Sequence, residues 1–276
     1  MRAIRCWPVD GRRRPTMTAV QEFRIVVPAR FASSRLPGKP LLPLAGRPMI
    51  QWVHERALAC GAREVVIATD DERIAAVARG FGADVEITSA AHESGTDRIA
   101  EVARRRGWPD EAVVVNLQGD EPLMPAALLR QVAALMATDL QAGMATLAGP
   151  LVGLEAFLDP NVVKVVATPD GRALYFSRAP IPWSRDTAPA GIASQSAFVG
   201  ARRHIGLYAY RVSALLRLSA LAPSCLERIE KLEQLRALEN GIGIRIEDAF
   251  QPPGPDVNTA ADLELAAATL LAEVRP

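Results

Sequence analysis

The sequence has few of the features that mark membrane-spanning, disulfide-bonded or metal-binding proteins. It contains no apolar run that approaches the roughly 20 residues a helix needs to cross a bilayer. Its three cysteines, Cys6, Cys60 and Cys225, are widely separated and form neither a disulfide framework nor the spacing of a metal site. We therefore expect a cytoplasmic protein with reduced thiols and without membrane insertion.

Two glycine-rich nucleotide signatures are also missing. There is no G-x-x-x-x-G-K-[ST] run, which argues against a P-loop kinase or ATPase. No G-x-G-x-x-G follows a strand pattern, so dinucleotide oxidoreductase chemistry has little support. The net charge of +1 provides no general attraction to nucleic acid or to an anionic membrane, and we expect no nucleic-acid partner.

Length and composition fit one α/β domain over residues 21–276, because 49% of the 276 residues are apolar and 23% are charged. Residues 1–20 show no hydrophobic period and no apolar region typical of a secretory signal. They contain five arginines: Arg2, Arg5, Arg12, Arg13 and Arg14. We interpret this segment as a disordered extension or as the product of a start assigned upstream of Met17. A transit peptide or a nucleic-acid-binding arm are the alternatives.

From Phe23 the hydrophobic pattern alternates between strand and helix. Short β-branched runs that end at breakers or polar residues predict strands at 25–27, 64–69, 85–88 and 112–117. Helices are predicted at 48–60, after Asp70-Asp71, from Ser94 to about residue 106, and at 125–136. This alternation favours a Rossmann-like, mainly parallel, doubly wound sheet with helices on both faces. Ligands of such sheets bind at the carboxyl ends of the strands.

The second half is less regular. Strands are predicted at 143–151, 162–168, 173–176, 205–210 and 242–246, and helices at 227–240 and 260–274. Ile229, Leu232 and Leu235 are expected to form the buried stripe of the helix at 227–240. Several prolines mark a loop-rich excursion before residue 200, so we predict a small inserted lobe at about 170–210.

The segment RIVVPARFASSRLPGKP, residues 24–40, combines a buried strand with a loop of small residues and cations. Arg30, Arg35 and Lys39 lie in this loop among Ser34 and Gly38. Backbone N–H groups and cationic side chains in such a loop can bind phosphates. A solvated basic loop is the alternative on composition alone.

Asp120 lies in a glycine-containing turn at the end of a predicted buried strand. A carboxylate there is suited to Mg²⁺, which prefers hard oxygen ligands and often takes only one or two from a protein. An N-cap for the next helix is the alternative interpretation. Together with a basic loop at the end of another strand of the sheet, Asp120 favours a nucleoside triphosphate site that contains Mg²⁺.

Eight ordered motifs closely resemble those of the 3-deoxy-manno-octulosonate cytidylyltransferase (CMP-Kdo synthetase) family. The resemblance covers about residues 22–273. The motifs are VPAR (27–30), SRLPGKP (34–40), GRPMI (46–50), SGTDR (94–98), VNLQGDEP (115–122), YFSR (175–178), RHIGLY (203–208) and LEQLR (232–236). The family resemblance implies a nucleotide-diphospho-sugar transferase fold with a small inserted lobe, and an enzyme that transfers CMP from CTP to the acidic sugar Kdo and releases pyrophosphate.

The resemblance also implies site residues. The nucleotide-binding residues would be Arg30, Ser34, Arg35, Lys39, Arg98 and Gln118, of which Lys39 and Arg35 act in catalysis together with Asp120. The sugar-binding residues would be Arg178, His204, Tyr208, Glu233 and Gln234. A fork-shaped cation suits the sugar carboxylate, which favours Arg178 for that role. A homodimer formed through the inserted lobe is expected on the same basis, and the product would serve lipopolysaccharide biosynthesis.

The C-terminal segment departs from the family pattern, which is roughly G-V-D-T-P-E-D-L and whose first Asp is a second metal ligand. Here that position is Asn258, whose amide oxygen can coordinate Mg²⁺ but carries no charge. Asp256, two residues earlier, is the alternative ligand. We expect retained activity with weaker or altered metal use.

Three alternatives remain open at this stage. The first is a CMP-sugar synthetase for sialic acid or an amino-modified Kdo, which would share the phosphate chemistry. The second is a nucleotidyltransferase specific for another base. The third is a protein that binds CTP without turnover, and Asn258 is the feature that favours it.

Overall fold

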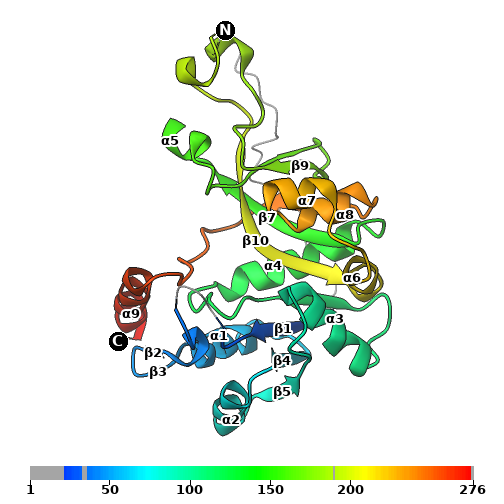
Figure 1. Cartoon of the computed structure of the whole chain (residues 1–276), viewed down its shortest axis with the longest axis vertical. Helices are drawn as coiled ribbons and strands as arrows, with labels where there is room; N and C mark the ends of the chain where they lie inside the picture. The colour runs from blue at the N-terminus through cyan, green and yellow to red at the C-terminus, as the bar shows by residue number, and fades with distance from the viewer. Residues whose placement is uncertain (1–21, 33–35, 189, 275–276) are drawn as a thin grey trace.

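A nine-stranded sheet with the strand order β11-β7-β10-β6-β1-β4-β5 forms the centre of the molecule, and β8 and β9 extend it beside β10 (Figure 1). The structure is a computed structural model that describes residues 22–32, 36–188 and 190–274. The strands of this sheet are β1 (Phe23–Ala29), β4 (Glu64–Thr69), β5 (Asp84–Ile87), β6 (Val113–Asn116), β7 (Met144–Pro150), β8 (Lys164–Ala167), β9 (Ala173–Ser177), β10 (Arg202–Arg211) and β11 (Ile244–Asp248).

Helices cover the sheet, and a short hairpin lies near its edge (Figure 1). The helices are α1 (Met49–Leu58), α2 (Glu72–Gly80), α3 (Gly95–Arg105), α4 (Ala126–Thr138), α5 (Gly153–Leu158), α6 (Val212–Ser219), α7 (Cys225–Glu230), α8 (Gln234–Glu239) and α9 (Ala260–Val274). The hairpin pairs β2 (Pro43–Leu44) with β3 (Arg47–Pro48), and the 3₁₀ turns are η1 (Lys39–Leu41), η2 (Arg185–Thr187) and η3 (Ile192–Ser194).

The expected mainly parallel sheet is confirmed. Strand β1 pairs in parallel with both β4 and β6, β4 with β5, and β7 with β11. Strand β10 is the main exception, because it runs antiparallel between β6 and β7. Its first residues therefore lie at the same edge of the sheet as the carboxyl ends of β6 and β7.

Both faces of the sheet are buried, which explains the continuous apolar runs in the strands. Ile25 and Val27 point into one core cluster, where Ile50 of α1 and Leu128 of α4 also lie. Val26 points into the other cluster, which contains apolar residues of α3, α6 and α8. Alternate residues of β1 thus anchor helices on opposite faces of the sheet.

The predicted helix at 227–240 is wrong in detail, because it is split into α7 and α8. Lys231, which follows α7, adopts a left-handed conformation with φ of 55° and ends the helix. Ile229 consequently turns outward and is 71% exposed, whereas Leu232 and Leu235 are buried as predicted. Helices α5 and α6 were not predicted.

The region of the predicted lobe contains β9, a loop-rich segment with η2 and η3, and the beginning of β10. The loop-rich segment projects away from the end of the sheet (Figure 1). The stacked rings of Phe157 and Phe198, whose centroids are 4.7 Å apart, connect it to α5. The predicted extension at 1–20 lies outside the described residues. Within the described residues, no helix combines the length and apolarity needed to span a lipid bilayer.

Candidate functional site

A cavity of about 460 Å³ lies at the carboxyl ends of β1 and β6. These strands are parallel neighbours, and Val26 pairs with Asn116, so the loops that follow them meet at one edge of the sheet. Polar and cationic residues line much of the cavity, as expected for a site that binds a charged ligand. They include Arg30, Lys39, Gln118, Asp120 and Asn258.

Lys39 connects the loop after β1 with two distant parts of the chain. Its Nζ atom donates hydrogen bonds to Asp120 Oδ2 at 2.8 Å and to the Val257 carbonyl oxygen at 2.8 Å. Asn258 Oδ1 lies 3.4 Å from the same nitrogen. Three oxygens therefore converge on one cationic position, and only 13% of the Lys39 side chain is exposed.

Two glycines allow this close approach of separate segments. A Cβ atom at Gly119 would lie 3.0 Å from the Pro28 carbonyl oxygen, so glycine lets the loops after β1 and β6 touch. A Cβ atom at Gly254 would lie 2.4 Å from Leu123 Cβ. The chain before Val257 can therefore pack directly against the loop that carries Asp120, whose carbonyl oxygen accepts a hydrogen bond from Val257 N at 2.9 Å.

Three carboxylates, those of Asp120, Glu121 and Asp256, interact unfavourably with one another beside the cavity. Burial raises the pKa of Glu121 well above its ordinary value, and the charges of Asp256 and Asp120 raise it further. Asp256 is exposed, yet desolvation and then the charge of Asp120 raise its pKa as well. Lys39 offsets part of this repulsion, and an additional cation would be stabilised here.

The donor set around Lys39 fits Mg²⁺. Carboxylate, amide and carbonyl oxygens are hard ligands, and Mg²⁺ commonly takes one or two carboxylates and keeps several waters. Asp120 provides a carboxylate, and Asn258 provides an amide oxygen beside it. The described ranges contain no group of three or more His, Cys, Asp and Glu side chains arranged as a metal centre. A bound Mg²⁺ would therefore depend on water and on ligand oxygens as well.

A smaller cavity of about 70 Å³ adjoins the first, and Arg30 and Gln118 line both. Arg98, in the first turns of α3, lines the smaller cavity and is only 3% exposed. Its guanidinium lies 3.3 Å from Asp70 Oδ2 and donates a hydrogen bond to Thr88 Oγ1. The ends of β4 and β5 thus fix the position of Arg98.

His92 is a residue of this smaller cavity that the sequence analysis missed. Its Nε2 atom lies 2.5 Å from Glu101 Oε2 on α3, and the same oxygen accepts a hydrogen bond from Ser89 N at 2.8 Å. The sequence offered one signal for this residue. His92 lies two positions before Ser94, the N-cap of α3, and therefore in the loop that precedes this helix.

A cluster of rings lies farther along the same edge, on β9 and β10. His204 packs between Phe176 and Tyr208, with ring centroids 4.9 Å and 5.4 Å away. Thr146 Oγ1 lies 3.0 Å from His204 Nε2. Burial lowers the pKa of His204 to about 3, so its imidazole is neutral at neutral pH. The buried hydroxyl of Tyr208 has no hydrogen-bond partner among the described residues.

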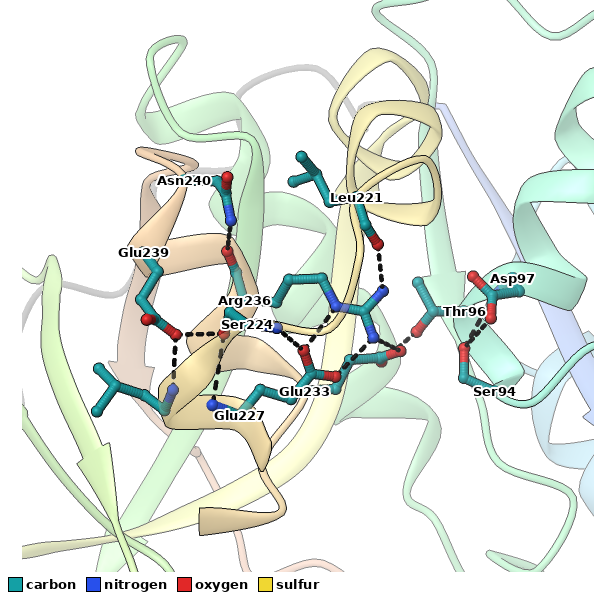
Figure 2. A network of polar contacts seen from close by, with 11 residues as sticks. Ser94, Thr96, Asp97, Leu221, Ser224, Glu227, Glu233, Arg236, Glu239 and Asn240 are labelled. Carbon is teal, nitrogen blue, oxygen red and sulfur yellow. Dashed lines mark hydrogen bonds and ion pairs between the residues drawn. The ribbon is translucent and has the colours of Figure 1, made fainter. Parts of the chain in front are cut away.

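Glu233 connects this region to the start of α3 (Figure 2). Its Oε2 atom accepts a hydrogen bond from Thr96 Oγ1 at 2.5 Å. Its Oε1 atom is buried without a hydrogen bond in the described part of the chain, and Arg236 Nη2 is 3.8 Å away. Burial raises the pKa of Glu233. Arg236 also forms a two-point ion pair with Glu227 at 2.8 Å and 2.5 Å, which holds α7 against α8.

Comparisons with known proteins agree with this geometry. A family model described as "Cytidylyltransferase" matches residues 24–246. A 3-deoxy-manno-octulosonate cytidylyltransferase of Thioalkalivibrio sulfidiphilus is 57% identical over 242 residues, which cover 88% of this chain and 96% of that protein. The chain belongs to the 3-deoxy-manno-octulosonate cytidylyltransferase family. A relative with the same description from Halorhodospira halophila is 52% identical over 248 residues, or 90% of this chain and 96% of its own.

A solved structure of a family member supports the same assignment. It is a CMP:2-keto-3-deoxy-manno-octonic acid synthetase complexed with CTP, with a TM-score of 0.82 and 42% sequence identity. The match covers 92% of this chain and all of that chain. The expected fold type and family are thereby confirmed. The family model ends at residue 246. Val257 and Asn258, whose oxygens lie beside Lys39 Nζ, are therefore beyond the matched range.

The structure brings many of the residues predicted from the family resemblance to one edge of the sheet. Arg30, Lys39, Gln118 and Asp120 line the larger cavity, and Asp120 is not the cap of α4, whose N-cap is Pro125. Their functional roles remain predictions. Ser34 and Arg35 lie outside the described residues, so the structure provides no position for either.

The structure shows where Arg178 and Gln234 lie, which the family resemblance alone could not. Arg178 Nε donates to the Glu230 carbonyl oxygen at 2.7 Å, and Nη1 donates to the Pro160 carbonyl oxygen at 3.0 Å. These bonds hold the guanidinium beside the end of α7. Gln234 is 6% exposed and begins α8, directly after Glu233. Both remain predicted contacts of the family's sugar substrate.

Proposed function

We propose that this protein transfers CMP from CTP to 3-deoxy-D-manno-octulosonate (Kdo), forming CMP-Kdo and pyrophosphate for lipopolysaccharide biosynthesis. The observation that carries the proposal is the meeting of Lys39 and Asp120 in a polar cavity at the carboxyl ends of β1 and β6. The similarity to relatives described as 3-deoxy-manno-octulosonate cytidylyltransferases supports this choice of substrates.

The reaction requires charge neutralisation more than covalent participation of the protein. The anomeric hydroxyl oxygen of Kdo attacks the α-phosphorus of CTP and forms a new P–O bond. The bond from the α-phosphorus to the bridging oxygen breaks, pyrophosphate leaves with the electron pair, and the hydroxyl proton passes to water. Lys39 and Arg30 both line the cavity, and we propose that they bind the triphosphate and stabilise the charge that develops on it. Ser34 and Arg35 are proposed to take part on family resemblance.

We propose that the enzyme depends on Mg²⁺ held by Asp120, with Asn258 or Asp256 as the second ligand. When bound, Mg²⁺ would neutralise phosphate charge and align the phosphate oxygens for in-line transfer. Lys39 donates a hydrogen bond to Asp120, so its charge would add to that of a bound Mg²⁺ beside the phosphates. The raised pKa values of Glu121 and Asp256 support a site that gains stability from an added cation.

Unpaired polar atoms support a polyhydroxylated sugar near β10 and α8. Tyr208 Oη and Glu233 Oε1 are buried and lack hydrogen-bond partners within the described residues, and sugar hydroxyls can donate to both. The neutral imidazole of His204 offers a further hydrogen bond but no charge for the sugar carboxylate. Arg178 retains guanidinium donors beyond its bonds to Glu230 and Pro160, and we propose that it binds that carboxylate.

Two further features belong to the same proposal. The enzyme is expected to form a homodimer through the lobe at about 170–210, where Trp183 and Ile192 are exposed apolar side chains. A cytoplasmic location belongs to the proposal because the three widely spaced cysteines fit reduced thiols.

The decisive experiment measures pyrophosphate release with Kdo and Mg²⁺ and each of CTP, UTP, ATP and GTP in turn. Release with CTP that depends on Kdo supports the proposal. If protein that binds CTP releases no pyrophosphate, then sialic acid replaces Kdo and Mn²⁺ replaces Mg²⁺ in separate trials. Activity with sialic acid alone would contradict the assignment of Kdo, and inactivity in every trial would contradict the assignment as a transferase.

A further inference from the structure

The loop after β1, which contains Arg30 and Lys39, is closed by contacts between Phe31 and Gly38. Gly38 N donates a hydrogen bond to the Phe31 carbonyl oxygen at 3.1 Å. Gly38 has a φ of 68°, and a Cβ atom there would lie 3.0 Å from two carbons of the Phe31 ring. Glycine therefore lets the ring lie directly against the backbone that precedes Lys39.

A cation from α2 lies over the same ring. The guanidinium carbon of Arg73 is 3.4 Å from the centroid of the Phe31 ring, which is a cation–π contact. Asp71 orients this guanidinium, because Oδ1 accepts a hydrogen bond from Arg73 Nε at 3.0 Å and Oδ2 accepts one from Nη2 at 2.6 Å. Asp71 is also the N-cap of α2 and accepts from Arg73 N at 2.9 Å. A planar cation held at two points is fixed in orientation over the ring.

The place of Asp71 in the fold connects these contacts with the cavities. Asp70 and Asp71 follow β4, the parallel neighbour of β1. Asp70 pairs with Arg98 of the smaller cavity, whereas Asp71 acts through Arg73 and Phe31 on the loop of the larger cavity. Asp71, Arg73 and Phe31 line neither cavity. Their contacts therefore hold the loop and leave a ligand in the cavities untouched.

We propose that Phe31 and Arg73 are positioning residues that hold the loop after β1 in the shape that binds the triphosphate. The inference rests on the proposed function and deepens it, because it assigns part of the triphosphate affinity to side chains outside the cavities. Lys39 directly follows Gly38, so loss of the Phe31 ring frees the backbone that carries the ammonium group. A loop that must be ordered during binding lowers affinity, and a preformed loop avoids this cost.

The test compares the affinities for CTP and CMP by calorimetry. Phe31→Leu removes the ring and should weaken CTP binding about tenfold. Arg73→Met should weaken it about threefold, because the Arg73 side chain is exposed and exposed cation–π contacts are weak. Phe31→Tyr keeps the ring and should retain the affinity. CMP lacks two of the three phosphates, so its affinity should fall less than that for CTP in both weakened variants.

Arg47→Met is the matched control. The Arg47 guanidinium carbon lies 4.8 Å from the centroid of the Trp52 ring, and both carboxylate oxygens of Glu55 accept from Arg47 Nη1, at 2.8 Å and 3.0 Å. This arrangement resembles that of Arg73, but its three residues line neither cavity and lie outside the loop after β1. The variant should leave both affinities unchanged.

An unchanged CTP affinity in folded Phe31→Leu and Arg73→Met would overturn the proposal. An equal loss of affinity for CTP and CMP would overturn it as well, because a general loosening of the fold would then explain the effect. If the wild-type protein bound CTP but released no pyrophosphate, the proposed function would fail by itself, and the binding comparison would still decide the role of Phe31 and Arg73. Failure of the wild type to bind CTP would overturn both.

Discussion

The ammonium group of Lys39 lies 2.8 Å from the Asp120 carboxylate, although 81 residues separate them in the chain. The pair brings the loop after β1 to the loop after β6, and the Val257 carbonyl oxygen binds the same ammonium group. One side chain therefore joins three segments around the larger cavity, which makes Lys39 the most informative position to change first.

Lys39→Met should lower kcat/KM for CTP by about 100-fold or more, because it removes the cation that we propose to bind the triphosphate. Lys39→Arg keeps the charge and should retain part of the activity. Pyrophosphate release under saturating Kdo is the measurement. Arg63→Met removes an exposed ion pair with Glu22 at the start of β4 and serves as the control. Equal activities of Lys39→Met and the control would show that Lys39 does not act on the triphosphate.

Asn258→Asp should change metal use. The backbone at this position is already held by Asp262, which accepts hydrogen bonds from Asn258 N and Thr259 N, so the new carboxylate should occupy the place of the amide. A second carboxylate beside Asp120 should lower the Mg²⁺ concentration for half-maximal activity about tenfold. It should also lower the melting temperature of the metal-free protein through like-charge repulsion. If neither quantity moved, position 258 would not be a ligand.

His204 should make folding sensitive to mild acid. Its pKa is about 3 in the folded protein and about 6.5 when unfolded, so the unfolded chain takes up the proton first. Stability therefore falls as the pH drops below about 6.5, by about 2 kcal/mol between pH 7 and pH 5. Urea unfolding of wild type and His204→Asn at both values measures this. His92→Asn is the control, and an identical pH response of wild type and His204→Asn would refute the prediction.

Tyr208→Phe should separate sugar binding from stability. The Tyr208 hydroxyl is buried without a hydrogen-bond partner in the described structure, so its removal should be neutral or stabilise the fold by about 1 kcal/mol. The KM for Kdo should nevertheless rise about tenfold, while the KM for CTP stays within about twofold. Thermal unfolding and steady-state kinetics test both parts. A loss of stability with an unchanged KM for Kdo would contradict the proposed sugar contact.

Arg236→Met should destabilise the protein by about 3 kcal/mol, because it leaves the Glu227 carboxylate without its buried partner. The side chains of this pair are 9% and 13% exposed. The exposed pair of Arg47 and Glu55 is the matched comparison, and Arg47→Met should cost less than about 1 kcal/mol. Chemical denaturation of both variants measures the difference, and equal losses would argue against a structural role for the α7–α8 corner (Figure 2).

The pattern of the sequence predicted the strands that lead into the larger cavity well. Ile25 to Val27 and the run before Gln118 are continuous apolar segments, and two parallel strands necessarily bring their following loops to one edge. The division of residues 227–240 into α7 and α8 was harder to predict, because the apolar spacing of this segment also fits one long helix. The capping box of Ser224 and Glu227 and the left-handed Lys231 divide it, and local spacing contains no information about either interaction.

Contacts between residues far apart in the chain could not be predicted either, because a local sequence pattern does not show which distant side chains meet. Glu233 has the sequence pattern of a solvated charge on a helix, yet its carboxylate accepts a hydrogen bond from Thr96 of α3, 137 residues earlier in the chain. Only the packed structure shows that they meet.

Strand β10 has a consequence for engineering new substrates. His204 and Tyr208 lie on β10, and Tyr208 pairs with Asn116 of β6, the strand that leads into the larger cavity, so the sheet fixes the spacing between the ring cluster and that cavity. A library that varies β10 would therefore alter acceptor and nucleotide preference together. The loop-rich segment before β10 lines neither cavity within its described residues, so its variation should leave the choice of base unchanged.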